Sequence, residues 1–335
     1  MFENIINNFT QKPLLHSELE LTGEIPYGDI EPYRTRALQE IALELDLPGF
    51  RKGFVPQDIA LKKVGELSVL EEAVEMFVRE FYPKLVEEKK IDAIGRPDIR
   101  ITKLAPNNPI ALTIRTALYP KIELPKNWQD ISNGVAKEEA AEPTPEELEA
   151  TLKSLQESRK KDEIAPELTD EFAKSVGAFQ TLDELKTKMK EGMFEEKKRM
   201  VKEKRRAQIL DALLEKTQMD IPGVFVESEQ EKMLSQLKDD ITRFNISFEE
   251  YLKRTDKTED ALRADFREQA EKRAKLQLML NTLADQEKIE PDEKDIEVEM
   301  KHALEHFPDA KPELLRIHIQ TVLRNEKVLK MLEAS

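Results

Sequence analysis

Apolar residues alternate with polar ones in three segments of the first 120 residues. The segments are residues 15–21, 97–103 and 110–118, and a period of two is typical of strands with one buried face. In the first segment the face that we expect to be buried holds Leu15, Ser17, Leu19 and Leu21. In the last segment it holds Ile110, Leu112, Ile114, Thr116 and Leu118. Two prolines and two asparagines at residues 106–109 predict the turn between the last two strands.

Segments whose apolar residues recur at helical intervals lie between these strands. These intervals predict helices over residues 30–45 and 57–64, and a third helix that ends near Lys89. Ser68 and Glu71 have the spacing of a capping box, so we expect the third helix to begin there. The N-terminal part is therefore predicted to be an α+β domain, in which helices cover one side of a small antiparallel sheet.

The rest of the chain is almost wholly helical in pattern. Thr144, Thr181 and Ser247 are expected N-caps, and prolines 222, 291 and 312 suit the first turns of further helices. The predicted helices cover residues 145–160, 181–217, 222–244, 247–254, 258–288, 291–307 and 312–333. We expect an elongated all-α C-terminal domain over residues 145–335, a linker over 121–144 that is poor in large apolar side chains, and the α+β domain over 1–120.

Composition agrees with a highly solvated helical protein. The 335 residues are 36% charged and 39% hydrophobic, which favours a modest core over a compact enzyme. There is no cysteine, so disulfides, thiol catalysis and thiolate metal sites are excluded. No apolar run is long enough to span a membrane, and the first residues lack the pattern of a secretory signal. We expect a cytoplasmic protein with no membrane partner.

The net charge of −15 argues against broad binding of DNA or RNA, because such binding relies on cations that neutralise phosphates. The charge is uneven, however. Between residues 49 and 63 the chain carries Arg51, Lys52, Lys62 and Lys63 against Asp58 alone. A local basic region on an acidic body can still contact RNA within a large assembly.

That basic region includes the run GFRKGFVP at residues 49–56. Glycine permits backbone angles that other residues avoid, and proline ends regular structure, so the run predicts a protruding loop. On such a loop the ring of Phe50 supplies apolar area and the guanidinium of Arg51 supplies directed hydrogen bonds. This combination is typical of a docking anchor.

The run resembles the ribosome-docking signature of bacterial trigger factor, Gly-Phe-Arg-x-Gly-x-x-Pro. Gly95, Arg96 and Pro97, which precede a further hairpin, also match that family. The segment PELTDEFAKSVG at residues 166–177 resembles the start of the family's C-terminal chaperone domain. The resemblance covers nearly the whole chain. It implies an ATP-independent, ribosome-associated chaperone that shields nascent polypeptides at the exit tunnel and assists protein folding and protein export.

The resemblance also assigns roles to the loop. Phe50 would anchor in an apolar notch, Arg51 would pair with a carboxylate, and Lys52 would meet a phosphate or another acid. Gly49 and Gly53 are expected to set the shape of the loop. The implied partners are a protein and nearby rRNA of the large ribosomal subunit beside the exit tunnel, and unfolded nascent chains. A homodimer of the free protein is compatible with the resemblance.

Methionines are concentrated in the helical half, where eight of the ten lie from residue 189 onward. Flexible thioethers suit surfaces that bind partners of varied shape, although they also fill gaps between helices. The residues that we expect to contact clients are Met189, Met193, Met233, Phe244, Phe248, Met279 and Met300. We expect about half of the methionines to lie in helix–helix cores instead.

One domain of the family has no counterpart here. Trigger factor carries an FKBP-like prolyl isomerase domain between the helix that corresponds to residues 145–160 and the segment that begins near Ile164. In this chain residues 156–163 join the two directly, which leaves no room for a domain of about 100 residues. The sequence therefore predicts that the protein is not an enzyme and lacks isomerase activity.

Other chemistry has little support. His302 and His306 fit a His-x-x-Glu-His pattern that chelates zinc on a helix, but we favour two surface histidines, because a catalytic zinc site usually needs a third protein ligand. Neither nucleotide-binding glycine fingerprint is present, so we expect no cofactor. The alternative function is a helical scaffold or adaptor that binds one folded partner and has no role on the ribosome.

Overall fold

The structure is a computed structural model, and it describes residues 2–160 and 165–334. By its internal contacts the chain forms two units. The first contains residues 1–123 and 218–278, and the second contains residues 124–217 and 279–335. The domains expected from the sequence, 1–120 and 145–335 with a linker between, are each one continuous segment. Each of the two units defined by contacts instead combines two separate segments.

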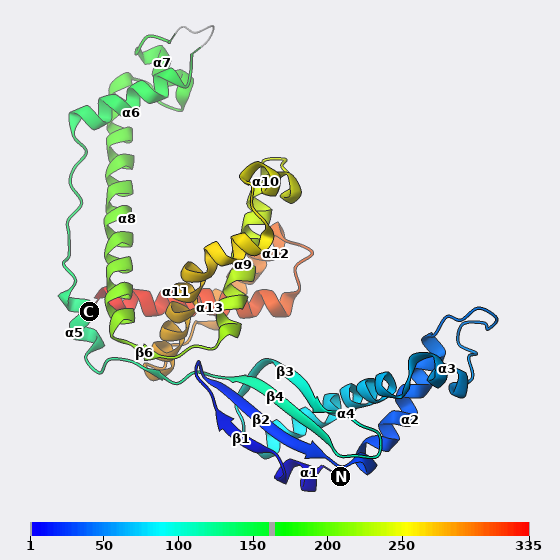
Figure 1. Cartoon of the computed structure of the whole chain (residues 1–335). Coiled ribbons are helices and arrows are strands. Elements are labelled where there is room, and N and C mark those ends of the chain that lie inside the picture. Colours follow the sequence, from blue (N-terminus) through cyan, green and yellow to red (C-terminus); the bar gives the residue numbers. More distant parts are fainter. Residues whose placement is uncertain (1, 161–164, 335) are drawn as a thin grey trace. The chain divides into compact units, whose positions relative to one another are not determined.

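The first unit is built on a four-stranded antiparallel sheet (Figure 1). Its strands are β1 (Thr10–Pro13), β2 (Glu18–Ile25), β3 (Ala93–Lys103) and β4 (Ile110–Leu118), in the order β1-β2-β4-β3. Leu21 pairs with Ile114 in the register between β2 and β4, and both side chains are fully buried. The face expected from the alternation in β4 is confirmed, because Ile110, Leu112, Ile114 and Thr116 are buried.

The expected first strand begins too early. Leu15 is 79% exposed and lies in the turn between β1 and β2, where His16 and Ser17 have positive φ angles of 59° and 48°. Residues 15–21 therefore comprise a tight turn followed by the start of β2. The short strand β1 was not expected, because its four residues are all exposed and carry no apolar period.

Four helices accompany the sheet: α1 (Glu3–Asn7), α2 (Tyr27–Glu44), α3 (Gln57–Val64) and α4 (Glu66–Glu88). Figure 1 shows that α2 and α4 lie side by side. Phe77 and Phe81 of α4 stack with ring centroids 5.1 Å apart inside the main core. The expected capping box at Ser68 is wrong, because α4 already begins at Glu66 after Gly65, whose φ is +85°.

The first unit also contains part of the helical half. A two-stranded pairing joins β5 (Ile122–Glu123) to β6 (Gln218–Met219), and α9 (Gly223–Arg243) and α10 (Phe248–Thr255) follow it. The next helix, α11 (Glu259–Gln286), packs against α9 through residues that include Ala270, Ala274 and Met233. Burial of the small alanines allows the two helix backbones to approach closely.

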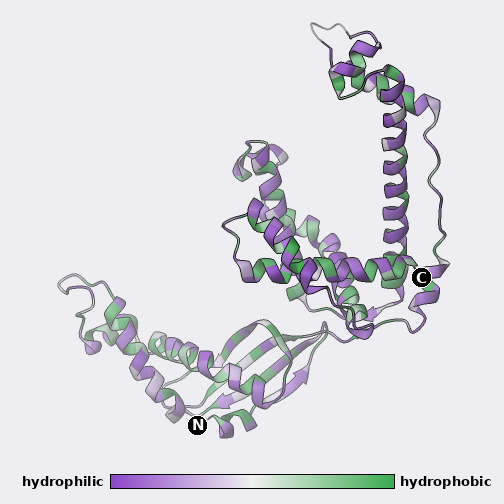
Figure 2. Ribbon diagram, turned by 180° about the vertical axis from the view of Figure 1, so that it is seen from behind, coloured by the Kyte–Doolittle hydropathy of each residue, from purple (hydrophilic) through white to green (hydrophobic). Residues whose placement is uncertain are grey.

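The second unit is organised around the long helix α8 (Leu182–Lys216). Figure 2 shows that α8 is hydrophilic over much of its length. At one end of α8, the helices α6 (Pro145–Glu157) and α7 (Asp170–Val176) share a small core of Leu152, Phe172, Ala173 and Leu185. At its other end, α8 contacts α5 (Trp128–Gly134) and α13 (Pro312–Ala334), and α12 (Glu293–His306) packs on α13.

The helices predicted for the second half all exist, with ends displaced by a few residues. Thr144, Thr181 and Ser247 cap helices as expected, each accepting a hydrogen bond from the backbone three residues later. The helices α1, α5 and α7 were not expected, because segments of five to seven residues are too short to show a helical period. The residues expected to form the linker thus include one helix, α5.

Candidate functional site

The run GFRKGFVP lies on an exposed loop between α2 and α3, which we call the tip (residues 45–56). Two backbone hydrogen bonds fold it into successive turns: the amide of Phe50 donates to the Leu47 carbonyl at 3.1 Å, and the amide of Phe54 donates to the Arg51 carbonyl at 3.0 Å. Gly49 and Gly53 have φ angles of +96° and +86°. Such angles strain residues with a Cβ, so the sequence of two glycines specifies this backbone path.

The residues expected to dock lie on the surface of the tip. Phe50 is 38% exposed and is not part of the main core, and Arg51 and Lys52 are exposed. Arg51, Lys52, Lys62 and Lys63 have no carboxylate within ion-pair distance among the residues that the structure describes. The tip therefore offers aromatic surface and unneutralised positive charge. What these residues contact stays a prediction.

The base of the tip is held by polar contacts between α2 and α4. Arg34 binds Glu66 through two hydrogen bonds of 2.5 and 2.7 Å, and the Tyr33 hydroxyl donates to Glu80 at 2.7 Å. The hydrogen bond from Arg34 holds the pKa of Glu66 below its usual value. Burial, reinforced by the bond to Glu80, raises the pKa of Tyr33 to about 12. These contacts fix α2, the helix that leads into the tip, against α4.

Two of the residues expected to contact clients lie in the interior. Met233 belongs to the core between α9 and α11, and Met279 is almost fully buried. The structure contradicts the prediction for both, because their side chains fill helix packing and offer no surface. Met189, Met193 and Met300 are half-buried, and Met189 packs on the core shared by α6, α7 and α8.

Phe244 and Phe248 are more accessible. Phe244 is 76% exposed at the end of α9, and Phe248 is half-buried at the start of α10 with the Lys238 ammonium 4.5 Å from its ring centroid. Both residues remain candidates for client contact. The structure thus separates the seven predicted positions into two buried ones and five with accessible surface.

A second group of exposed apolar residues was not predicted as a set. It lies on α12, α13 and the segment between them, and each member is at least half exposed: Val298, Phe307, Leu314, Ile317 and Val322. Soluble proteins expose single apolar residues routinely, but a group on adjoining helices is typical of an interaction surface. The available sequence signal was the spacing of Leu314 and Ile317, which lie three residues apart on α13 and therefore share a helix face.

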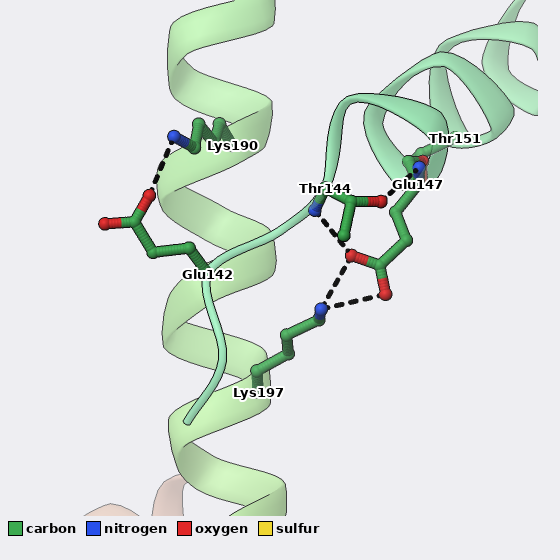
Figure 3. Close-up of polar contacts among 6 residues, drawn as sticks. All are labelled: Glu142, Thr144, Glu147, Thr151, Lys190 and Lys197. Atoms are coloured by element: carbon green, nitrogen blue, oxygen red, sulfur yellow. Dashed lines mark hydrogen bonds and ion pairs between the residues drawn. The ribbon is translucent and has the colours of Figure 1, made fainter. Parts of the chain in front are cut away.

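The segment that precedes α6 is fastened along α8 (Figure 3). Glu142 accepts a hydrogen bond from Lys190 at 3.0 Å, and Lys197 donates to both carboxylate oxygens of Glu147 at 2.6 and 2.8 Å. Glu147 also completes a capping box with Thr144. The hydrogen bond from Lys197 holds the pKa of Glu147 below its usual value. The expected bridge from α6 to the next segment includes residues 161–164, which lie outside the described residues.

The metal hypothesis gains no further ligand from the structure. His302 and His306 lie one turn apart on α12, with ring centroids 4.9 Å apart. Among residues 2–160 and 165–334, no group of three or more His, Asp or Glu side chains could hold a metal ion. Within the same residues, none of the helices has the length and apolar character needed to cross a membrane.

An aromatic and cationic tip on one unit, together with exposed apolar residues scattered over helices, is typical of chaperones that dock on a larger assembly. The comparisons with known proteins agree. The family model described as bacterial trigger factor protein matches residues 7–155, and the model of the bacterial trigger factor C-terminus matches residues 181–334. This chain belongs to the trigger factor family, and it is a chaperone of that family.

Individual relatives are distant but match over most of their length. The chain is 24% identical to the trigger factor of Halothermothrix orenii over 91% of each chain. It is also 24% identical to the trigger factor of Listeria monocytogenes, over 86% of this chain and 88% of the relative. A solved structure, described as showing promiscuous substrate recognition in folding and assembly by the trigger factor chaperone, has the same fold. Its TM-score is 0.56 at 18% identity, over 98% of this chain and 99% of that one.

Proposed function

We propose that this protein is an ATP-independent chaperone that docks on the large ribosomal subunit through the tip and shields nascent polypeptides as they leave the exit tunnel. The observation that carries the proposal is the exposed GFRKGFVP tip with its unneutralised cations. Membership of the trigger factor family supports it. Docking on ribosomes places the protein in the cytoplasm, where it would assist folding and export.

The tip residues divide the docking between them. Phe50 inserts its ring into an apolar notch of a ribosomal protein, Arg51 pairs with a carboxylate, and Lys52 meets a phosphate of nearby rRNA or another acid. Gly49 and Gly53 keep the loop in the observed turns. Truncation of anchors of this kind typically costs about 2 kcal/mol or more in binding free energy.

Clients bind the exposed apolar residues weakly. The candidates are Phe244 and Phe248 on the first unit, and Met189, Met193 and Met300 together with the exposed group of α12 and α13 on the second. A client held with micromolar affinity and an association rate near 10⁶ M⁻¹s⁻¹ leaves in about 1 s, whereas nanomolar affinity retains it for about a quarter of an hour. Synthesis of a 100-residue domain takes several seconds, so the weaker regime suits repeated shielding without ATP.

Two finer points belong to the same proposal. The chain has no prolyl isomerase domain. Two findings support this: the family models leave only residues 156–180 between them, and the alignment to the Halothermothrix orenii relative spans 396 positions although this chain has only 335 residues. The free protein can also form a homodimer, in which a second copy covers part of the exposed apolar surface. Neither point alters the docking proposal.

Sedimentation with ribosomes tests the docking. We expect the wild-type protein to pellet with ribosomes, and a Phe50→Ala/Arg51→Ala/Lys52→Ala variant to lose at least thirtyfold in affinity. The matched control is Lys12→Ala/Leu15→Ala, which removes an exposed cation and an exposed leucine from the β1–β2 region of the same unit. Equal pelleting of the wild-type and tip variants would contradict the proposal, and absence of wild-type pelleting would favour the adaptor alternative.

A further inference from the structure

The tip carries a second aromatic residue that the docking signature leaves unspecified. Phe54 occupies a position where the family pattern allows any residue, yet its ring is 69% exposed, which is almost twice the exposure of Phe50. Most large aromatic side chains gain about 2 kcal/mol or more from burial. Exposure alone does not mark a docking residue, because Leu15 is more exposed still, so the role of Phe54 depends on where the ring lies within the tip and on what it contacts.

The chain path forces Phe54 outward. Val55 is 6% exposed and belongs to the main core of the first unit, so it fastens the end of the tip to the body. Phe54 and Val55 follow the turn that the Phe54 amide closes, and of the two only Val55 is buried. With Val55 turned inward and Gly53 at a φ of +86°, the ring of Phe54 projects into solvent.

Phe54 also contacts the cation that the docking needs. The guanidinium carbon of Arg51 lies 5.5 Å from the centroid of the Phe54 ring, within the range of a cation–π interaction. The backbone hydrogen bond from the Phe54 amide to the Arg51 carbonyl closes the same turn. Because the flexible Arg51 side chain rests on the ring, less of its conformational freedom remains to be lost on binding.

This contact bears on the kind of partner. One face of the Phe54 ring is occupied by Arg51, which leaves the ring edge and the opposite face for a bound surface. Around the ring, residues 46–63 carry four basic and two acidic side chains, and the basic ones have no carboxylate partner. An apolar notch with an acidic rim complements this arrangement in shape and in charge.

We propose that Phe54 is a second docking anchor, which inserts its ring into an apolar notch of an acidic ribosomal protein surface and positions Arg51 for a carboxylate on the rim of that notch. The inference rests on the proposed docking of the tip on the ribosome. To the proposed docking the inference adds a contact residue, a positioning role for that residue and the class of macromolecule that the Phe54 ring contacts.

Three variants test the anchor in the full-length protein. In ribosome sedimentation, Phe54→Ala should weaken binding about tenfold, and Phe54→Leu should recover only part of that loss because it restores apolar area without a ring. Phe54→Tyr retains the ring and should bind within about twofold of the wild type. Leu15→Ala removes an even more exposed apolar residue from the same unit and should bind as the wild type does.

The positioning role has its own measurement. If the ring orients Arg51, the double variant Arg51→Ala/Phe54→Ala should bind more tightly than the product of the two single losses predicts. Thermal unfolding and circular dichroism should be unchanged in all variants, because Phe54 and Arg51 lie outside the core. If Phe54→Ala pellets like the wild type while the Phe50/Arg51/Lys52 variant does not, the second anchor is refuted and the docking proposal stands.

Photocrosslinking identifies the partner class. Benzoylphenylalanine at position 54 should crosslink to ribosomal protein on irradiation with purified ribosomes, and the adduct should survive ribonuclease. The same group at position 15 should give no adduct above background. An adduct at position 54 that ribonuclease removes would assign the ring to rRNA and overturn the protein notch.

Discussion

At the scale of single residues, the proposed docking uses a few side chains that the core does not use. The tip presents Phe50, Phe54, Arg51 and Lys52 to solvent, and Val55 alone among its last residues is buried. This presentation needs a backbone that only glycine adopts without strain at two positions. If the tip docks as proposed, we expect Gly49 and Gly53 to affect binding although they contribute no side chain.

Replacement of Gly49 by alanine separates backbone strain from steric conflict. A Cβ at Gly49 would meet no atom within 4 Å, so the only penalty is its φ of +96°, which costs about 1–2 kcal/mol. We expect Gly49→Ala to move the loop away from its docking conformation and to weaken ribosome binding three- to tenfold. Gly28→Ala is the control, because Gly28 has equally open surroundings but lies in α2. Wild-type binding by Gly49→Ala would show that this glycine does not set the shape of the tip.

At the scale of elements, isolated ends of helices are fastened by charged groups. The last turn of α13 is bound to α8 through Glu333, which accepts a hydrogen bond from Arg206 at 2.6 Å and lies 3.3 Å from Lys202. Burial by itself raises the pKa of Glu333, but the hydrogen bond from Arg206 and the charge of Lys202 outweigh it and leave the pKa below its usual value. The ionised carboxylate is thus favoured by the folded state.

The lowered pKa of Glu333 predicts a pH-dependent stability. The stabilisation is fully present above the ordinary value near 4.5 and is lost as the pH falls through the lower pKa of the folded state. Glu333→Gln should reduce the free energy of unfolding by about 1 kcal/mol at pH 7, and the difference from the wild type should shrink below pH 4. Urea unfolding of both proteins at several pH values measures this difference in the free energy of unfolding. Glu326→Gln, at an exposed position of the same helix, should show little effect, and a loss for Glu333→Gln that is independent of pH would contradict the assignment.

Elements also show how far local sequence signals reach. The caps at Thr144, Thr181 and Ser247 were predicted because a hydroxyl and the amide three residues later belong to one local segment. The same signal failed at Ser68, where α4 starts two residues earlier and contacts with α2, including Arg34 to Glu66, hold its first turn. At Ser68 the sequence has the spacing of a capping box, but tertiary contacts place the start of the helix two residues earlier.

At the scale of the whole molecule, the chain combines the tip, which is the proposed docking site, with exposed apolar residues on several helices. The sequence identified the residues expected to contact clients only by their chemical type, and it could not show which of them are exposed. Met233 and Met279 turned out to fill the interior, while Phe307 and Ile317 are exposed. Dispersed surface of this kind suits weak binding of many unfolded segments better than tight binding of one partner.

The proposed loss of the isomerase domain is tested on the intact protein. In a proline-isomerisation assay on a short peptide, the wild-type chain should leave the rate at its uncatalysed value, because the sequence between residues 145–160 and 166–177 is too short for a domain of about 100 residues. A family member that contains the isomerase domain serves as the positive control. Acceleration that is proportional to the concentration of this protein, and retained after further purification, would overturn the prediction.

The sequence by itself determined the α+β and all-α division, every described helix of eight or more residues, and the tip with its aromatic and cationic residues. These features follow from local periods, caps and glycine positions, which act between residues close in the chain. Only the tertiary structure decided that residues 218–278 group with the N-terminal residues, that Met233 is buried, and that the ring of Phe54 lies beneath Arg51. The physical reason is that burial and side-chain contact depend on which segments meet in space, and the period of one segment does not specify its partner.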